Sequence, residues 1–234
     1  MPSPEQSSER KTSGDFDFPP LLDNWQYLLG GLGYTLALSI ATVVGSFILG
    51  LTIALARLYG PGWLRKLLIF YIDSMRAIPV LVVLVWTYFA LPLLFGISLP
   101  PFWAALVALI AHISAYVAEI IRAGIESIRL GQIRAALALG MSRAQLTRKI
   151  VLPQALVRMM PACGSIISIT IKDTAIAVVI AVPEVMKRPE TLVGQTYRPI
   201  EIFTVVALIY FALLFPITRL IDRLYQRIAH LGRS

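Results

Sequence analysis

The sequence predicts an all-α integral membrane protein with about five transmembrane helices. Hydrophobic residues make up 57% of its 234 positions and charged residues only 15%, which is too apolar for a soluble domain of this length. Three long stretches contain no Asp, Glu, Lys or Arg: 24–56, 77–118 and 202–218. A membrane-spanning helix needs roughly 20 apolar residues, so each stretch can hold at least one span.

These stretches give four of the predicted spans, and the apolar run 160–182, which includes Lys172 and Asp173, gives the other. The stretch 77–118 belongs to an apolar region too long for one span, and the residues Gly-Ile-Ser-Leu-Pro-Pro at 96–101 predict a turn within it. The five predicted spans are 32–56, 67–95, 102–121, 160–182 and 202–220. An odd number of spans puts the two ends of the chain on opposite sides of the membrane.

The basic residues predict the orientation, because short cytoplasmic loops carry an excess of Lys and Arg. The loop after the first span, the segment 122–158 and the C-terminal tail together hold 14 of the 21 basic residues, against five on the other side. We therefore expect the N-terminus outside and both the C-terminus and segment 122–158 in the cytoplasm. This topology also explains the net charge of +8, and no soluble basic face predicts a nucleic-acid partner.

The membrane domain is expected to occupy most of the chain. Residues 1–24 are polar and lack the apolar core of a signal peptide, so they predict a disordered periplasmic tail. Residues 25–228 form the predicted transmembrane domain, and 229–234 the end of a cytoplasmic tail.

A polar and basic segment, 134–153, interrupts the apolar pattern between the third and fourth spans. Good helix formers precede Gly140, which stands where a left-handed residue ends a short helix. Ser142 followed by Gln145 predicts a capping box, so we expect a helix, a sharp corner and a second helix. The small residues Ala135 and Ala136 allow close approach to another protein, with Leu137 projecting; an amphipathic helix lying on lipid headgroups is the alternative.

Two adjacent charges, Lys172 and Asp173, lie within the predicted fourth span and are followed by Thr174. An ionisable residue at this depth usually faces a bundle interior or a water-filled path. Neighbours on a helix diverge by about 100°, so the two cannot fully satisfy each other. They either tether this helix to others or contact the charged groups of a zwitterionic substrate.

Two further sets of residues could gate a pathway. Glu119 and Arg122 are three apart at the end of the third span, and Glu126 and Arg129 repeat that spacing, so both pairs predict ion pairs. Glu119 lies closer to the membrane and is a candidate gate or substrate residue, whereas helix-end electrostatics explains the second pair.

Arg76 and Pro79 mark the start of the apolar part of the second span. Proline kinks a helix and frees a carbonyl, so this point suits a moving gate, and a snorkelling Arg at the membrane interface explains it equally well. His112, in the third span, is expected to be a hydrogen-bonded packing residue.

Small residues recur every four positions in the first span, at Thr42, Ser46, Gly50 and Ala54. Such a stripe lets helices pack closely in lipid. It predicts a tight helix contact for the first span.

The sequence contains no motif for chemistry of its own. It lacks a phosphate-binding Gly-x-x-x-x-Gly-Lys-Ser/Thr loop, a Cys/His cluster with metal spacing and a Ser/His/Asp set. No catalytic residue, metal or cofactor is therefore predicted, and energy for transport would come from a partner or an ion gradient.

Five ordered blocks resemble a known family. They are 115–125, 131–132, 135–142, 150–155 and 171–174. Together they resemble the permeases of ABC importers for polar amino acids, the histidine, glutamine and glutamate/aspartate uptake group, and the resemblance runs from about residue 31 to 228. It implies a bacterial inner-membrane complex with the type I importer fold.

The resemblance implies specific partners: a cytoplasmic ATPase dimer that uses ATP and Mg, a second permease subunit and a periplasmic amino acid binding protein. It further implies that Arg134, Ala135, Ala136, Leu137 and Gly140 form the ATPase-coupling loop. Arg134 departs from the pattern, because the family usually has Glu there. An ion-coupled secondary carrier and a non-transporting scaffold are the alternative functions.

Overall fold

The computed structural model describes residues 25–229, and every element in that part of the chain is helical. The element order is α2 (Trp25–Tyr59), α3 (Gly62–Ala77), α4 (Val80–Phe95), α5 (Pro101–Glu126), α6 (Leu130–Ala138), α7 (Arg143–Leu146), a π-helical turn η1 (Thr147–Val151), α8 (Leu152–Asp173), a 3₁₀ helix η2 (Thr174–Ile180), α9 (Lys187–Thr196) and α10 (Pro199–Ala229).

The candidate membrane spans agree with the sequence prediction. Four stretches are long and apolar enough to cross a membrane: Trp25–Tyr59, Pro101–Glu126, Arg143–Ile180 and Pro199–Arg227. The pair α3 and α4 makes a fifth if the two count as one broken span. The all-α membrane fold predicted from composition is therefore confirmed.

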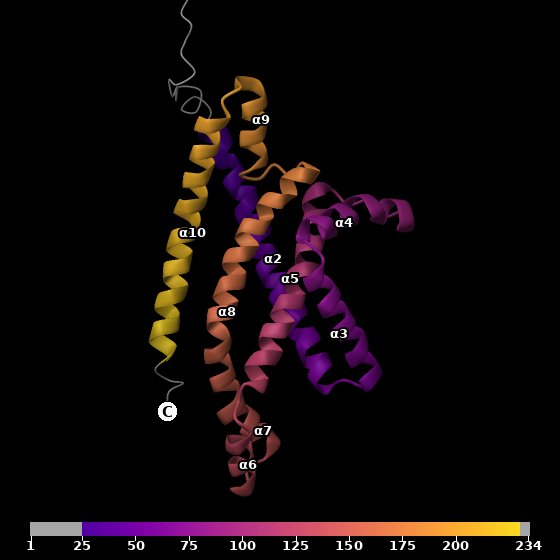
Figure 1. The fold of residues 1–234 in the computed structure, drawn as a ribbon, viewed down its shortest axis with the longest axis vertical. Helices are drawn as coiled ribbons and strands as arrows, with labels where there is room; N and C mark the ends of the chain where they lie inside the picture. Colours follow the sequence, from indigo (N-terminus) through magenta and orange to yellow (C-terminus); the bar gives the residue numbers. More distant parts are fainter. Residues whose placement is uncertain (1–24, 230–234) are drawn as a thin grey trace, which may run out of the picture.

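The predicted second span, 67–95, is not a single helix. Its two halves, α3 and α4, are bent by 106° at a break around Ile78 and Pro79. Ile78 has an extended backbone (φ −87°, ψ 131°), as expected for a residue before proline. The sequence predicted a kink here, but the break is a sharp corner, and α4 runs across the long axis of the other helices (Figure 1).

The first span packs along α5 through its small residues. Thr42, Ser46, Gly50 and Ala54 are all buried. A Cβ atom at Gly50 would stand 2.7 Å from the Cβ of Val117 on α5, so only glycine allows this approach. The close helix contact predicted from the stripe is therefore confirmed.

The long helices separate two ends of the molecule. The short helices α6 and α7 lie at one end and α9 at the other (Figure 1). Helix α2 begins near α9, and α10 ends on the side of α6 and α7 (Figure 1). This is the arrangement that five crossings require, while the assignment of the α6 end to the cytoplasm stays a prediction.

Two predicted segments lie wholly or mostly outside the described residues. The periplasmic tail expected at 1–24 is one of them, and the tail end expected at 229–234 is described only at its first residue.

Candidate functional site

The segment between α5 and α8 forms the helix, corner and helix that its sequence predicts. Gly140 is left-handed (φ 80°). The N–H of Met141 donates to the carbonyl of Ala136 at 3.2 Å and that of Gly140 to Leu137 at 3.0 Å, which is a Schellman ending for α6. A side chain with a Cβ is strained at this φ, so glycine sets the sharpness of the corner.

The capping box that opens α7 is also confirmed. The backbone N–H of Gln145 donates to the Ser142 hydroxyl at 3.3 Å, and the Ser142 N–H donates to the Gln145 side chain at 2.9 Å. We call residues 130–146 the α6–α7 corner. Capping hydrogen bonds thus form at both the C-terminal end of α6 and the N-terminal end of α7.

The α6–α7 corner presents apolar side chains outward. Leu130, Leu137 and Leu139 are 67%, 46% and 83% exposed, whereas Ala136 is buried. Leu130 and Leu137 are seven residues apart and therefore share one face of α6, whereas Leu139 is its C-cap residue. Exposed apolar side chains gathered on a short helix can mark a binding surface. Arg134 is exposed beside them and has no ion-pair partner among the described residues.

The corner is fixed to the long helices at its base. The Arg158 guanidinium on α8 donates to the carbonyl of Ser127 and lies 3.1 Å from its hydroxyl. Ile128 and Leu146 are both buried. The Arg158 contact joins α8 to the end of α5, directly before the corner.

Glu119 is the centre of an ion network near the same end of α5. Its carboxylate is bonded to Arg57 on α2 at 2.9 Å and also to Arg122. The predicted Glu119–Arg122 pair is therefore confirmed. The predicted pairing of Glu126 with Arg129 is wrong: α5 ends at Glu126, so Arg129 leaves the helix face, and Glu126 pairs with Arg122 instead.

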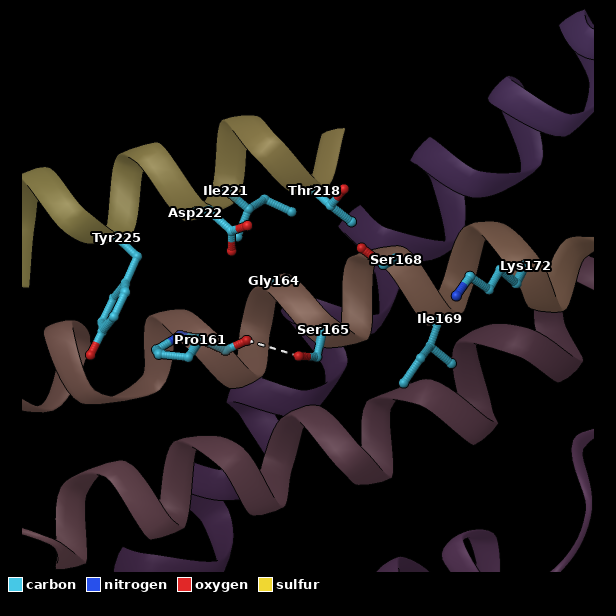
Figure 2. A pocket seen from close by; sticks show the side chains of 10 residues that line it. All are labelled: Pro161, Gly164, Ser165, Ser168, Ile169, Lys172, Thr218, Ile221, Asp222 and Tyr225. Atoms are coloured by element: carbon cyan, nitrogen blue, oxygen red, sulfur yellow. Dashed lines mark hydrogen bonds between the residues drawn. The ribbon is translucent and has the colours of Figure 1, made fainter. Parts of the chain in front are cut away.

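Lys172, Asp173 and Thr174 lie at the junction of α8 and η2 rather than in mid-helix. Lys172 is exposed and Asp173 half-buried, and neither side chain has a hydrogen bond or ion pair within the described part of the chain. Thr174 is buried, and its hydroxyl donates to the carbonyl of Ile171 at 2.8 Å. Lys172 borders a groove of about 380 Å³ between α8 and α10 (Figure 2).

The bend between α3 and α4 lies against η2. Val80, directly after Pro79, packs in the same hydrophobic cluster as Ala177 and Ile180 of η2. The Arg76 guanidinium lies over the ring of Tyr116 on α5, 5.7 Å from its centroid, and the Tyr116 hydroxyl donates to the Arg76 carbonyl at 3.4 Å. The Arg76–Pro79 bend therefore lies next to η2, the element that directly follows Lys172 and Asp173.

Sequence reasoning missed Glu184, the most buried carboxylate among the residues that the structure describes. It follows η2 in the connection between two spans and is fully buried. Its carboxylate accepts hydrogen bonds from the N–H groups of Met186 and Lys187, both at 2.8 Å, and from the hydroxyls of Thr35 at 3.5 Å and Tyr210 at 3.4 Å. Burial raises the pKa of Glu184 to about 7, although these hydrogen bonds oppose the shift.

A signal for Glu184 exists in the sequence. It is the first acidic or basic residue after Asp173, and Pro183 directly precedes it. Its two backbone donors are local, but the hydroxyl donors Thr35 and Tyr210 come from α2 and α10, which no local pattern reveals.

His112 agrees with its prediction only in part. It is buried, and its ring packs against that of Tyr116 with centroids 5.3 Å apart. Its Nδ1 atom has no hydrogen-bond partner among the described residues, so the expected hydrogen bond at that nitrogen is absent.

Comparison with known proteins identifies the family. Residues 46–230 match the family described as the binding-protein-dependent transport system inner membrane component. The glutamine transport system permease protein GlnP of Escherichia coli (strain K12) is 34% identical over 214 residues, covering 91% of this chain and 97% of GlnP. The arginine transport system permease protein ArtQ of Bacillus subtilis (strain 168) is 34% identical over 207 residues, covering 87% and 93%.

A solved structure agrees with the fold. The crystal structure of an amino acid ABC transporter with histidines matches with a TM-score of 0.86 and 33% identity, covering 91% of this chain and 99% of that one. The family match spans most of the described residues and includes the α6–α7 corner. The chain therefore belongs to the family of binding-protein-dependent transport system inner membrane components.

Proposed function

We propose that this chain is the permease subunit of an ATP-driven importer of polar amino acids in the bacterial inner membrane. The single observation that carries the proposal is the α6–α7 corner: a rigid, exposed apolar surface at one end of a membrane domain of this family. A surface of this kind needs a partner, and this chain has no phosphate-binding loop of its own.

The partner on this surface is a cytoplasmic ATPase dimer, which binds ATP and Mg. Ala135, Ala136 and Leu137 form the docking helix, and Gly140 sets the corner that transmits movement to α8. Arg134, where the family usually has Glu, pairs with an acidic residue of the ATPase or leaves that role to a second, different permease subunit. The high count of basic residues in 122–158 supports a cytoplasmic location for the corner.

The translocation pathway runs past the residues that bear unpaired or shared charges. Lys172 and Asp173 are available to a zwitterionic solute because neither side chain has a hydrogen bond or ion pair with a described residue of this chain. Thr174 is buried beside them, and the bend at Arg76 and Pro79 packs against η2, so a movement of α4 changes the surroundings of this junction. Glu119, tied to two arginines, gates the cytoplasmic end.

The other partners are a second permease subunit and a periplasmic amino acid binding protein. The substrate class rests on the relatives, whose names state glutamine and arginine transport. The binding protein contributes to the choice of amino acid, and it is a separate chain, so this sequence does not name the substrate. Family membership argues against the secondary carrier, since members of this family work with a binding protein.

The test is uptake into proteoliposomes that contain the complex of this chain with its cognate ATPase and binding protein. We expect uptake of labelled amino acids only when ATP is supplied to the ATPase, and hydrolysis stimulated by the loaded binding protein. Gradient-driven uptake by this chain without an ATPase would support the secondary carrier, and the absence of any substrate-dependent hydrolysis would support a scaffold.

A further inference from the structure

Helix α8 has a polar stripe that faces α10. Gly164, Ser168 and Lys172 follow one another at four-residue spacing and therefore lie on one side of the helix. Toward its N-terminal end α8 is apolar, since Leu152, Leu156 and neighbouring residues line a separate cavity toward α2 that contains no charged side chain. A stripe that ends in a lysine is costly against lipid, so its natural surroundings are protein or water.

The stripe borders the groove of about 380 Å³ between α8 and α10 (Figure 2). From α10, Thr218, Asp222 and Tyr225 line the opposite wall. Lys172 stands at one end of the groove and Tyr225 at the other, which lies toward the end of α10 (Figure 2). Both walls therefore carry polar groups over the length of the groove.

The hydroxyl of Ser168 is a polar group at the groove that its own helix does not use. Its neighbours on α8 are bonded to their own helix: Ser165 donates to the Pro161 carbonyl at 3.1 Å, and Thr170 donates to that of Ile166 at 2.8 Å. Ser168 is only 9% exposed, yet its hydroxyl has no hydrogen bond within the described residues. Figure 2 shows it in the space between the two helices, whereas Ser165 points away from α10.

The charges at the groove are also unpaired. Neither the Lys172 nor the Asp222 side chain has an ion pair or hydrogen bond among residues 25–229. Asp222 neighbours Ile221, whose Cβ would stand 3.5 Å from a Cβ built at Gly164. Lys172 is eight residues beyond Gly164, so the two charges are offset by roughly 12 Å along the helix. The ammonium and carboxylate of an α-amino acid share one carbon and cannot reach both charges together.

Resting on the proposed function, we infer that this groove is the cytoplasmic half of the translocation path, a track for free α-amino acids lined by Ser168 and Thr218. Lys172 binds the substrate carboxylate at the end of the groove that is farther from the cytoplasm. Ser168 and Thr218 form hydrogen bonds with the solute as it passes, and Asp222 attracts its ammonium at the cytoplasmic exit. The offset between the charges makes the groove a sequence of weak contacts, which favours release over tight binding.

The test uses cysteine accessibility in the assembled complex in lipid nanodiscs. Cys163, which lines the apolar α2–α8 cavity, is first replaced (Cys163→Ser), and single Thr218→Cys and Ser168→Cys variants are made in that background. Leu220→Cys is the matched control, because Leu220 is two residues from Thr218 on the same helix and 58% exposed on another face. The reaction rate with a charged, water-soluble thiol reagent is measured with and without amino acids.

A thiol reacts as the thiolate, so a water-filled groove speeds its modification while lipid suppresses it. We expect Thr218→Cys and Ser168→Cys to react at least about tenfold faster than Leu220→Cys. A mixture of the protein L-amino acids, then L-glutamine and L-arginine singly, should lower the rate of thiol modification at Thr218→Cys and Ser168→Cys. The rate at Leu220→Cys should not change.

A second comparison tests the charge. Lys172→Met in the Thr218→Cys background should raise the amino acid concentration needed for protection by roughly tenfold, the effect of losing one charge-assisted contact. Lys187→Met is the control, because Lys187 pairs with Glu190 on α9, away from the groove.

Equal reactivity at 218, 168 and 220, or reactivity that no amino acid slows, would overturn the groove assignment. The same Cys163→Ser complex is assayed for ATP-driven uptake in parallel. Normal uptake with an unreactive groove would reject this inference alone, whereas the absence of ATP-driven uptake would reject the proposed function.

Discussion

The hydroxyl of Thr35 on α2 and the carboxylate of Glu184 lie 3.5 Å apart, although 149 residues separate them in the chain. The same Thr35 oxygen accepts the N–H of Val185 at 3.1 Å. Tyr210 on α10 completes the set, so three segments meet at one buried carboxyl group. We call this set of residues the hub. Its Glu184 lies between η2 and α9, and α9 is at the end of the molecule opposite to the α6–α7 corner (Figure 1).

Glu184 should make the stability of the protein depend on pH. Its pKa is raised from 4.5 to about 7, so the folded carboxyl keeps its proton where the unfolded one has lost it. The stability that Glu184 provides is therefore greatest below pH 4.5 and falls as pH rises to about 7, by on the order of 3 kcal/mol in all. The thermal midpoint of the purified protein across this range measures the effect.

Glu184→Gln is the matched control, because it keeps the shape of the side chain but cannot titrate. Its thermal midpoint should lose most of the pH dependence between pH 4.5 and 7. An equal pH dependence in both proteins would assign the effect to other groups.

Gly31 should be irreplaceable at its contact with the hub. A Cβ at Gly31 would stand 2.9 Å from the carbonyl carbon and oxygen of Glu184, and backbone atoms cannot move aside as a flexible side chain can. Gly31→Ala should destabilise the fold by about 1–3 kcal/mol. Gly33→Ala is the control, since no atom lies within 4 Å of a Cβ at that position, and it should be neutral or stabilising. Equal thermal midpoints would contradict the close packing.

Glu119 should matter more than Glu126 in the ion network. Glu119 is shared by Arg57 and Arg122 and its side chain is 24% exposed, whereas Glu126 bonds only Arg122 and is 53% exposed. Glu119→Gln should lower stability by about 1 kcal/mol or more, because two arginines lose a charged partner. Glu126→Gln should cost only a few tenths. Thermal midpoints of the two variants at low and high salt measure these stability losses. A larger loss for Glu126→Gln than for Glu119→Gln would show that the Arg57 contact is unimportant.

Features set by local sequence could be predicted, and those set by tertiary contact could not. The capping box of Ser142 and the left-handed Gly140 depend on a few neighbouring residues, and both were predicted correctly. The bend of 106° at Pro79 was underestimated, because proline marks a break while packing against α5 and η2 sets its angle.

The candidate site divides in the same way. Glu119 and Arg122 face each other because they share one helix, so spacing alone predicted their pair. Glu184 is bonded by Thr35 of α2, and the Ser168 hydroxyl borders a groove whose other wall is α10; both helices are far away in the sequence. A pattern within one span could not indicate either of them.

Substitutions at Gly140 test directly whether the α6–α7 corner couples transport to a partner ATPase. Because φ is 80° there, Gly140→Val strains the corner, whereas Gly140→Asn tolerates it. The measurement is ATP hydrolysis stimulated by the loaded binding protein, together with uptake, in complexes shown to retain the ATPase. We predict near-normal coupling with Asn and at least about a tenfold loss of uptake per ATP with Val. Normal stimulated hydrolysis and uptake in the Gly140→Val complex would contradict the account.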